Sequence, residues 1–341
     1  MNSKLLEIID PFDSDDKFEI EIIEGNNDYI KKGYLISKPS MKKVPILDDI
    51  PNFEAIEKSS HPQKETYNFW WNESHKTHEY NEDQNRIIFN KTIKISESEF
   101  KDSVVLDLGC GNGRFSDIVS KYQPSLLVLF DISDGIFTAY ENAKKNCENV
   151  IALKGNILSI PLKRKFYDIV YSWGVLHHTG NTRFSFSLAS QLVKLNGKLG
   201  IYVYKNKPSY SYNNIGIRLL AILRQLLVIK VLRSLCTYLP GRYVIYLFQP
   251  IYYFEKSINI GIVGCHGEGK NKFNKNDYFR RVIDRFKTRY ATEHTVGEII
   301  KWFFDENFND IYVGDQYEVS ITGIKEELHT KEKRIFINHY K

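Results

Sequence analysis

The sequence has few cysteines, and this scarcity limits the classes of protein that it can encode. Its 341 residues include only Cys110, Cys147, Cys236 and Cys265, and no two of them form a CxxC pair. Such wide spacing argues against a disulfide framework or a zinc knuckle and favours the reduced thiols of a cytoplasmic protein. We therefore expect no metal site.

A long uncharged apolar segment is also missing. No stretch approaches the roughly 18–20 apolar residues that a membrane-spanning helix requires. The first ten residues lack the apolar core and the cleavage site of a signal peptide. These absences predict a cytoplasmic protein without a membrane span, and they leave peripheral membrane contact open.

The sequence also lacks a large excess of positive or negative charge. The chain has 47 basic and 42 acidic residues, which gives a formal net charge of +5. A dedicated nucleic-acid binder usually carries a stronger or more clustered basic excess, so nucleic acid is not the expected partner. Hydrophobic residues make up 42% of the chain, which is enough for a sizeable core without disulfide bonds.

Hydrophobic periodicity divides the chain into consecutive segments. Period-two alternation interrupted by Gly and Pro predicts strands and turns at the front, and strand–helix alternation follows from Val104. The segments are a small strand-and-turn module (1–60), a linker with an aromatic and helical part (61–99), a strand–helix core (100–204), a helical lid insertion (205–285), the completion of the core sheet (286–325) and a tail of no assigned place (326–341).

Seven short apolar runs have the length of buried strands. Because they alternate with helical patterns, they predict an α/β, Rossmann-like fold with a seven-stranded, mostly parallel sheet and helices on both faces. The expected strands are 104–108, 126–130, 150–153, 167–171, 198–203, 310–313 and 319–324, and the clearest expected helices are 114–122, 184–195 and 295–304.

A glycine-rich turn follows the first of these strands. Glycines permit a tight reversal and bring a ligand close to bare backbone, where a Cβ would collide. The helix that begins near Arg114 would offer free N–H groups to a carboxylate, and Asp107 would receive an α-amino group. Any tight βα turn can contain such glycines. The predicted cofactor contacts of the turn are Asp107, Gly109, Cys110, Gly111, Asn112 and Gly113.

The glycine spacing argues against a nicotinamide cofactor. The dinucleotide fingerprint requires G-x-G-x-x-G, whereas this turn has G-x-G-x-G, which suits a nucleoside without a pyrophosphate. Asp131 ends the next strand 18 residues after Gly113, so it is placed to accept both ribose hydroxyls and to repel a 2′-phosphate. A solvated strand end is the alternative interpretation. Ile132, beside it, belongs to the same predicted site.

A third element follows the strand at 150–153. In Gly155-Asn156-Ile157 the side-chain oxygen of Asn156 can accept a hydrogen bond from the exocyclic amine of an adenine, and Ile157 can flank the ring. Asn156 does this less strongly than a carboxylate.

These motifs resemble the successive motifs of class I S-adenosylmethionine-dependent methyltransferases of the UbiE-like, or methyltransferase type 11, group. The resemblance covers about residues 100–203 and rests on Val105–Gly113, Asp131, Gly155-Asn156 and Tyr167–Thr179. It implies S-adenosylmethionine as the cofactor, bound also by Ser172 and Trp173. Family members usually carry Asp at the position of Asn156.

The resemblance extends more loosely toward the front. Lys64–Trp71 is similar to an aromatic segment of a bacterial subgroup, and Trp71 is a predicted substrate contact. Gly33–Ile36 and Val44–Pro51 resemble a small Trm112-like zinc module, but the cysteines of such a module are absent. If the front segment has the fold of that module, it would therefore contain no metal.

The segment after the fourth strand favours oxygen or carbon acceptors on small molecules. Enzymes that methylate exocyclic or amide nitrogens often carry Asp/Asn-Pro-Pro-Tyr there, and this chain has Ser172-Trp-Gly-Val-Leu-His-His178 instead. His177 and His178 are the candidate bases, with His178 favoured, and structural packing is the alternative. Tyr204 is a predicted substrate-lining residue.

Three functions remain open on the sequence. The first is methyl transfer to a small-molecule, glycan or lipid-like acceptor, for which the apolar 205–285 segment would form a lid; an ordinary helical cap explains that segment equally well. The second is an RNA methyltransferase, suggested by the basic run at 270–287, which is more often a solvated face. The third is a non-catalytic S-adenosylmethionine-binding protein. The sequence does not reveal the oligomeric state.

Overall fold

A computed structural model describes residues 2–10, 17–57, 62–74, 81–206, 231–259, 274–314, 318–327 and 333–337. The chain forms two units. The first comprises Met1–His61, Tyr80–Lys205 and Thr292–Lys341, and the second comprises Pro62–Glu79 and Asn206–Ala291. The segment predicted at 61–99 is therefore divided between the two units.

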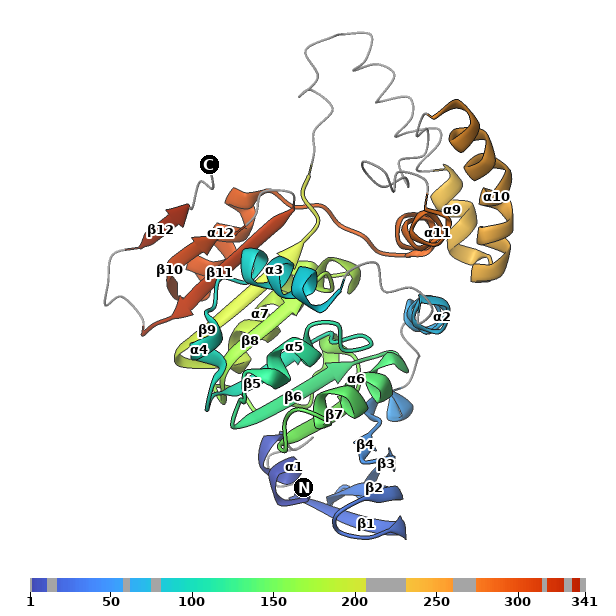
Figure 1. The fold of residues 1–341 in the computed structure, drawn as a ribbon. Helices are drawn as coiled ribbons and strands as arrows, with labels where there is room; N and C mark the ends of the chain where they lie inside the picture. Colours follow the sequence, from blue (N-terminus) through green and yellow to red (C-terminus); the bar gives the residue numbers. More distant parts are fainter. Residues whose placement is uncertain are drawn as a thin grey trace. The chain divides into compact units, whose positions relative to one another are not determined.

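A mixed sheet forms the centre of the first unit (Figure 1). Its strands lie in the order β12-β10-β11-β9-β8-β5-β6-β7. They are β5 (Val104–Leu108), β6 (Leu126–Asp131), β7 (Val150–Lys154), β8 (Tyr167–Trp173), β9 (Val193–Val203), β10 (Phe308–Val313), β11 (Val319–Lys325) and β12 (Arg334–Ile337).

The strand order reverses next to β5. From β5 the chain adds β6 and β7 on one side and β8 and β9 on the other, all in parallel, while β11 pairs antiparallel with β9. Ligands of open α/β sheets bind at such a switch point, beyond the carboxyl ends of the strands. The glycine-rich turn leaves β5 at this end, so the topology and the motif point to the same place.

The predicted α/β, Rossmann-like fold with its β-rich N-terminal module is confirmed, but the number of strands was wrong. The eighth strand, β12, pairs in parallel with β10 at the edge of the sheet. It has only four residues, all exposed, so it has no buried face that a hydrophobic pattern would reveal. A second difference concerns β9, which begins at Val193 and includes residues expected at the end of a helix. Its pairing with β8 is irregular there, and Asn196 has a φ of 60°.

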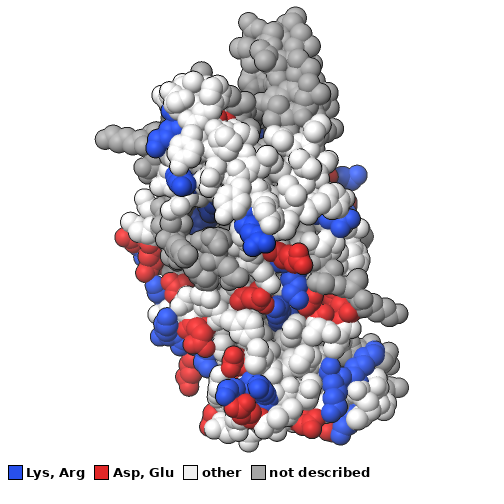
Figure 2. Space-filling view, turned by 90° about the vertical axis from the view of Figure 1, so that its right-hand side faces the viewer, with Lys and Arg blue, Asp and Glu red and all other residues white. Residues whose placement is uncertain are grey.

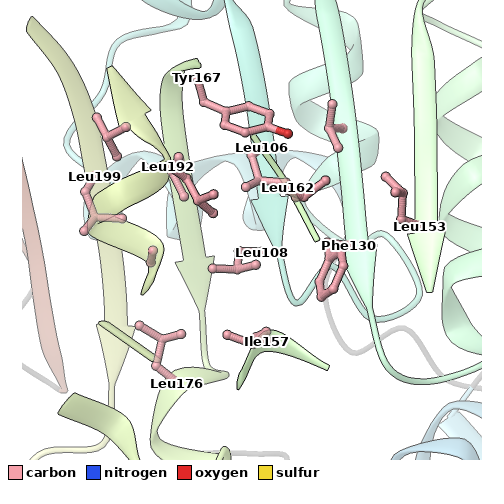
Figure 3. Packing of buried hydrophobic residues seen from close by; sticks show 14 of the residues in the cluster. Leu106, Leu108, Phe130, Leu153, Ile157, Leu162, Tyr167, Leu176, Leu192 and Leu199 are labelled. Atoms are coloured by element: carbon pink, nitrogen blue, oxygen red, sulfur yellow. The ribbon is translucent and has the colours of Figure 1, made fainter. Parts of the chain in front are cut away.

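Helices cover both faces of the sheet, as Figure 1 shows. One face packs against α3 (Glu82–Thr92), α5 (Ser116–Lys121) and α6 (Gly135–Lys144). The other packs against α1 (Asn2–Ile8), α7 (Thr182–Leu192) and α12 (Val296–Asp305). Figure 3 shows the interior of this second layer, where Leu106, Leu108 and Phe130 of neighbouring strands belong to one buried cluster with Ile157 and Leu176.

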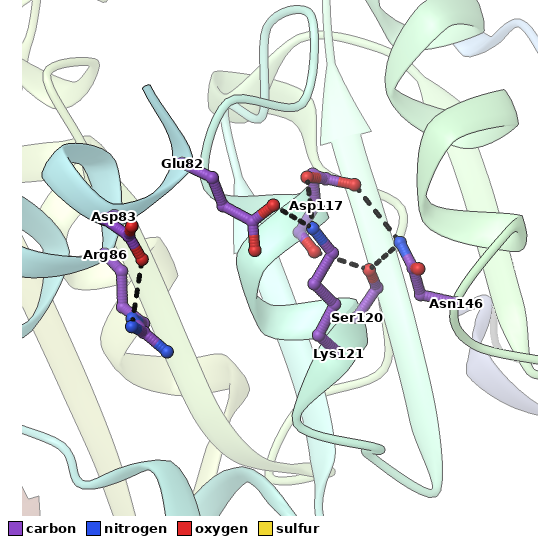
Figure 4. Close-up of polar contacts among 7 residues, drawn as sticks. All are labelled: Glu82, Asp83, Arg86, Asp117, Ser120, Lys121 and Asn146. Atoms are coloured by element: carbon purple, nitrogen blue, oxygen red, sulfur yellow. Dashed lines mark hydrogen bonds and ion pairs between the residues drawn. The ribbon is translucent and has the colours of Figure 1, made fainter. Parts of the chain in front are cut away.

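Local signals explain where several of these helices begin. Asn81 and Gln84 form a capping box before α3, and Thr295 and Glu298 form another before α12. The short α4 (Glu97–Phe100) follows α3 and buries Phe100. Helices α3 and α5 are joined by an ion pair of 2.7 Å between Glu82 and Lys121 (Figure 4).

The N-terminal module is a four-stranded antiparallel sheet of the first unit. It consists of β1 (Lys17–Gly25), β2 (Ile30–Lys38), β3 (Lys42–Leu47) and β4 (Ile50–Pro51), followed by the 3₁₀ helix η1 (Phe53–Ile56). Asn52 forms a parallel bridge to Lys154 of β7, and Phe53 joins the hydrophobic cluster of the main sheet. Asp49 accepts a hydrogen bond of 3.2 Å from Tyr140 of α6. The module is thereby fixed to the β7 edge of the main sheet.

The second unit is helical. Its described helices are α2 (Lys64–Ser74), α9 (Val231–Tyr238), α10 (Gly241–Ile258) and α11 (Lys275–Val282), which continues as a π-helical turn, η7 (Ile283–Lys287). Phe248, Tyr278 and Phe286 are buried in its core. Residues 207–230 and 260–273 of the predicted lid lie outside the described residues. Among the helices that the structure describes, none has the length and apolar character needed to cross a membrane.

Candidate active site

Asp107 lies near the carboxyl end of β5 and is almost completely buried. Its Oδ2 accepts hydrogen bonds from the hydroxyl groups of Ser116 at 2.5 Å and Tyr171 at 2.8 Å. Burial raises the pKa of Asp107 to about 7, although both hydroxyl donors oppose the shift. A nearby cation would favour the ionised form, so this carboxyl group suits the ammonium group of an amino acid, the role that the sequence predicted for it.

The three glycines of the turn have positive φ angles of 91°, 55° and 88° at Gly109, Gly111 and Gly113. We expected a Cβ here to collide with the cofactor, but at two positions it would collide with the protein itself. A Cβ at Gly109 would lie 2.5 Å from Val175, and one at Gly113 would lie 2.7 Å from the Cα of Ala139. The glycines therefore allow the turn to pack between Val175, which follows β8, and α6.

The helix after the turn begins later than predicted. It was expected near Arg114, but α5 begins at Ser116 and has only six residues. Arg114 instead donates a hydrogen bond of 2.8 Å to Asn85 of α3, and its guanidinium lies 4.7 Å from the centre of the Phe115 ring. The backbone before Ser116 thus serves to connect the turn to α3, and the predicted binding of a carboxylate there stays a prediction.

Asp131 ends β6 beside the glycine-rich turn. Its Oδ2 accepts from the N–H of Gly111 at 2.8 Å, and its Oδ1 accepts from the N–H of Ser133 at 2.7 Å and the hydroxyl of Ser133 at 2.6 Å. Burial raises its pKa, while Ser133 and Gly111 oppose the rise. Two carboxylate oxygens offer about four acceptor positions. The carboxylate therefore holds the turn in place. These three donors leave it one acceptor position for a ribose hydroxyl, and its assignment to both ribose hydroxyls stays a prediction.

Asn156 follows β7 and caps the 3₁₀ helix η2 (Ile157–Ser159). Its Oδ1 accepts from the N–H of Leu158 at 3.0 Å, and its Nδ2 donates to Glu57 of the N-terminal module at 3.4 Å. Ile157 is buried next to it. The amide oxygen that was predicted to meet the adenine amine is thus already used locally.

Ser172 and Trp173 end β8 on the other side of β5. The Ser172 hydroxyl donates to the carbonyl of Leu108 at 2.7 Å and holds β8 to the start of the turn. The Trp173 indole N–H donates to Thr92 at 3.0 Å, and its ring meets Phe115 edge-on with centroids 4.9 Å apart. Trp173 therefore joins α3, β8 and the residue that precedes α5, close to the turn.

The two histidines lie on the 3₁₀ helix η3 (Leu176–His178), immediately after Val175, which packs on Gly109. Both are buried, His177 completely and His178 to 4% exposure. The His177 ring lies 4.0 Å from the centres of both the His178 and Tyr204 rings. The structure therefore gathers three predicted site residues into one cluster beside the cofactor turn.

His177 has an unusual environment within this cluster. Neither of its ring nitrogens has a hydrogen-bond partner among the residues that the structure describes, although both are buried. Burial, followed by the neighbouring His178 and His294, lowers its pKa well below the ordinary value. The ring is consequently neutral at physiological pH, with one donor and one acceptor unused. Unpaired buried polar atoms are uncommon in folded proteins, and a catalytic role is one of the explanations for them.

Residues 292–294 form backbone hydrogen bonds with two residues of the cluster. The N–H of Thr292 donates to the His177 carbonyl at 3.0 Å, and the N–H of His294 donates to the Tyr204 carbonyl at 2.9 Å. The His294 ring interacts with the Thr292 hydroxyl at 3.0 Å. His294 and Thr292 were not predicted as site residues, because more than 85 residues separate them from Tyr204 in the sequence.

Trp71 belongs to a different unit from the other predicted site residues. It lies on α2 in the second unit, where its ring centre is 6.1 Å from that of Trp70. Its assignment as a substrate contact stays a prediction. Within the described residues, no group of three or more His, Cys, Asp or Glu side chains could hold a metal ion.

Comparison with known proteins is consistent with this geometry. Residues 99–215 match a family model described as a methyltransferase domain. The ubiquinone biosynthesis O-methyltransferase of Pelagibacter ubique is 27% identical over 174 residues, which cover 48% of this chain and 70% of the relative. The tRNA U34 carboxymethyltransferase of Ruthia magnifica is 31% identical over 107 residues, but this chain spans only 32% of its length.

Among solved structures, the magnesium protoporphyrin IX methyltransferase of Synechocystis with bound S-adenosylhomocysteine is similar to this chain. The sequences are 13% identical, the TM-score is 0.44, and the match covers 77% of this chain and 98% of the other.

Proposed function

Residues 99–215 form an S-adenosylmethionine-dependent methyltransferase domain, and from that premise we propose that the protein methylates a hydroxyl oxygen of a small, apolar acceptor. The cofactor supplies a methyl group on a positively charged sulfur. Asp107, the glycine-rich turn and Asp131 would hold it, because two carboxyl groups at the ends of adjacent strands fit its ammonium group and its ribose. The acceptor would lie at the ring cluster beyond the turn.

The observation that carries the proposal is the cluster of His177, His178 and Tyr204 beside the cofactor turn. A neutral hydroxyl is a weak nucleophile and transfers its proton to a base as it attacks the methyl group. Imidazole is suited to this role near neutral pH. We assign the base to His178, which is 4% exposed whereas His177 is completely buried, and a positioning role to His177, whose ring centre lies 4.0 Å from that of His178.

An apolar acceptor is supported by the second unit. Its helix α10 carries no charged residue from Tyr243 to Phe254, and Tyr243, Tyr246, Tyr253 and Phe254 are all exposed. The only acidic residue of α10, Glu255, is buried. Exposed aromatic side chains of this kind interact with lipid-like molecules or a membrane surface. The name of the ubiquinone-related relative supports the same class of acceptor.

The test is methyl transfer from radiolabelled S-adenosylmethionine to purified acceptors. We expect label in phenols and hydroquinones that carry an apolar chain, and none in the matched compounds whose hydroxyl is already methylated. His178→Ala should lower kcat by a factor of about 10²–10⁴ while cofactor affinity is kept, since general-base catalysis contributes that much. Unchanged turnover in His178→Ala would remove the base assignment.

A tRNA acceptor is the second candidate, because one relative of 31% identity is named as a tRNA enzyme. The face shown in Figure 2 gives it little support, since basic and acidic side chains are interspersed on it. Binding of tRNA that weakens steeply with salt, together with label in tRNA and in no small molecule, would favour this candidate over the first.

We also propose that the chain belongs to the bacterial subgroup with a Trm112-like front segment. The support is the antiparallel sheet β1–β4, which precedes the methyltransferase domain and is fixed to its β7 edge. Deletion of residues 1–57 should then impair the domain, and an unaltered truncated domain would contradict the assignment.

A further inference from the structure

The carboxylate of Glu57 lies at the end of β7 although it belongs to the N-terminal module. It accepts a hydrogen bond from Nδ2 of Asn156 at 3.4 Å and another from the hydroxyl of Ser159. Glu57 follows η1 directly, and the bridge between Asn52 and Lys154 fixes η1 beside β7. The module therefore brings an acidic side chain to the edge of the cofactor site.

The position of this carboxylate matches the expected place of the adenine. Asp131, at the end of β6, is the residue suited to the ribose. Strands β5, β6 and β7 are consecutive in the sheet, so a nucleoside whose ribose lies at Asp131 and whose amino-acid end lies at Asp107 would place its base toward the end of β7. Glu57, Asn156 and Ile157 meet at that end, and Asn156 and Glu57 are both partly exposed.

Adenine presents a 6-amino group, which needs a hydrogen-bond acceptor. The amide of Asn156 is poorly arranged for this role, because its oxygen caps η2 through Leu158 and its N–H₂ end is directed at Glu57. Glu57 has acceptor atoms only. Its two oxygens offer about four acceptor positions, and Asn156 and Ser159 occupy two of them. A hydrogen bond to a carboxylate is also stronger than one to a neutral amide.

We propose that Glu57 recognises the adenine of S-adenosylmethionine by accepting a hydrogen bond from its 6-amino group. The N-terminal module then forms part of the cofactor site. Asn156 positions Glu57 through its Nδ2 and does not read the base itself.

The test compares S-adenosylhomocysteine with S-inosylhomocysteine, in which a 6-oxo group replaces the 6-amino group. Binding is measured by calorimetry on the full chain without any acceptor. The wild-type protein should prefer the adenosyl compound, because the 6-oxo group would face the Glu57 carboxylate. Glu57→Ala should lower the affinity for the adenosyl compound about tenfold or more, the usual effect of losing a hydrogen bond to a charged group.

Glu57→Gln gives the sharper result. Its amide can donate to a 6-oxo group, so this variant should bind the inosyl compound more tightly than the wild type does and the adenosyl compound more weakly. Adding Asn156→Asp to Glu57→Gln should restore the preference for adenosine, since a carboxylate is again present at the end of β7. Glu24→Gln, which changes an exposed ion pair on β1 of the same module, is the matched control and should bind like the wild type.

These binding results test the role of Glu57 independently of the identity of the methyl acceptor. If Glu57→Gln and Glu57→Ala bind both compounds as the wild type does, Glu57 does not read the base and the proposal is wrong. A wild-type protein that binds neither compound would overturn the cofactor site and this proposal together. Neither result depends on which hydroxyl compound is methylated. If Glu57→Ala does not fold, the isosteric Glu57→Gln and its double variant decide the question.

Discussion

The phenol of Tyr171 donates a hydrogen bond of 2.8 Å to the carboxyl group of Asp107, and the two residues face each other across the β5–β8 ladder. Ser116 donates to the same oxygen from α5. These two donors do not cancel the effect of burial, which raises the pKa of Asp107 to about 7. Asp107, which we propose binds the cofactor's ammonium group, is therefore half protonated near neutral pH in the ligand-free protein.

Cofactor affinity should consequently rise with pH. The ammonium group favours ionised Asp107, so binding at pH 6 first requires the loss of a proton, whereas at pH 8 the carboxylate is already present. Affinity for S-adenosylhomocysteine should increase about tenfold from pH 6 to pH 8. Calorimetry across this range checks the prediction. Asp107→Asn should bind weakly and show no such rise; a wild type with flat affinity would contradict the assigned role.

The raised pKa of Asp107 should also make the ligand-free protein less stable as pH rises, whereas cofactor affinity increases. An acid whose pKa is higher in the folded than in the unfolded protein loses protons less readily when folded. Its contribution to stability therefore falls as pH rises from about 4, the unfolded value, to about 7. Asp107→Asn, which cannot ionise, should lessen this fall in the ligand-free protein, and thermal unfolding at several pH values measures it.

Gly113 supports a prediction about the turn itself. Its φ is 88°, and a Cβ would lie 2.7 Å from the Cα of Ala139 on α6. Gly113→Ala should lower the free energy of unfolding by about 2 kcal/mol or more, because it combines left-handed backbone strain with a contact to rigid backbone.

Gly297 provides the matched control. It lies in the first turn of α12, and a Cβ there would meet nothing within 4 Å. Gly297→Ala should therefore stabilise the protein by about 0.5–1 kcal/mol. Denaturant titration of both variants measures the difference. A Gly113→Ala variant as stable as the wild type would show that α6 can move away from the turn.

Much of the first unit could be predicted from the sequence, because its signals are local. The apolar runs of β5, β6 and β7 each precede a polar or glycine-rich turn, and in a parallel sheet these turns meet at one edge. Asp107, Asp131 and Asn156 were therefore assigned to a common site without knowledge of the structure. The structure places each of them at the carboxyl end of its strand.

Contacts between distant segments could not be predicted in this way. Glu57 was assigned to the N-terminal module and to no site, yet it lies beside Asn156, 99 residues later. The collision of Gly113 with Ala139 depends on the packing of α6, which no glycine spacing reveals. β12 is too short and too exposed to leave a hydrophobic pattern. In each case the contact is determined by tertiary packing between segments that are distant in the sequence, and not by the neighbouring residues.

Asp131 should prove more important for binding than for the fold. Asp131→Ala removes the acceptor for the ribose and for Gly111 together, so cofactor affinity should fall about 10- to 100-fold. Ser133→Ala removes only one of the donors to Asp131 and keeps the backbone N–H of residue 133, so it should weaken binding less than tenfold. Equal binding by Asp131→Ala and the wild type, measured by calorimetry, would exclude Asp131 from the ribose site.

His177 should show a conflict between stability and activity. Its two unpaired nitrogens are buried, and each such group costs about 1–3 kcal/mol relative to an apolar replacement that fits. His177→Phe should therefore raise Tm, but it should lower kcat because the ring that positions His178 changes.

Since burial lowers the pKa of His177, the unfolded chain binds more protons than the folded chain below about pH 6.5. The wild type should lose stability as pH falls through this value, and His177→Phe should lose less. Thermal unfolding between pH 5 and 8, together with methyl transfer by the same variants, checks both parts. A variant that is less stable than the wild type at pH 6 would show that His177 is held by interactions that favour it.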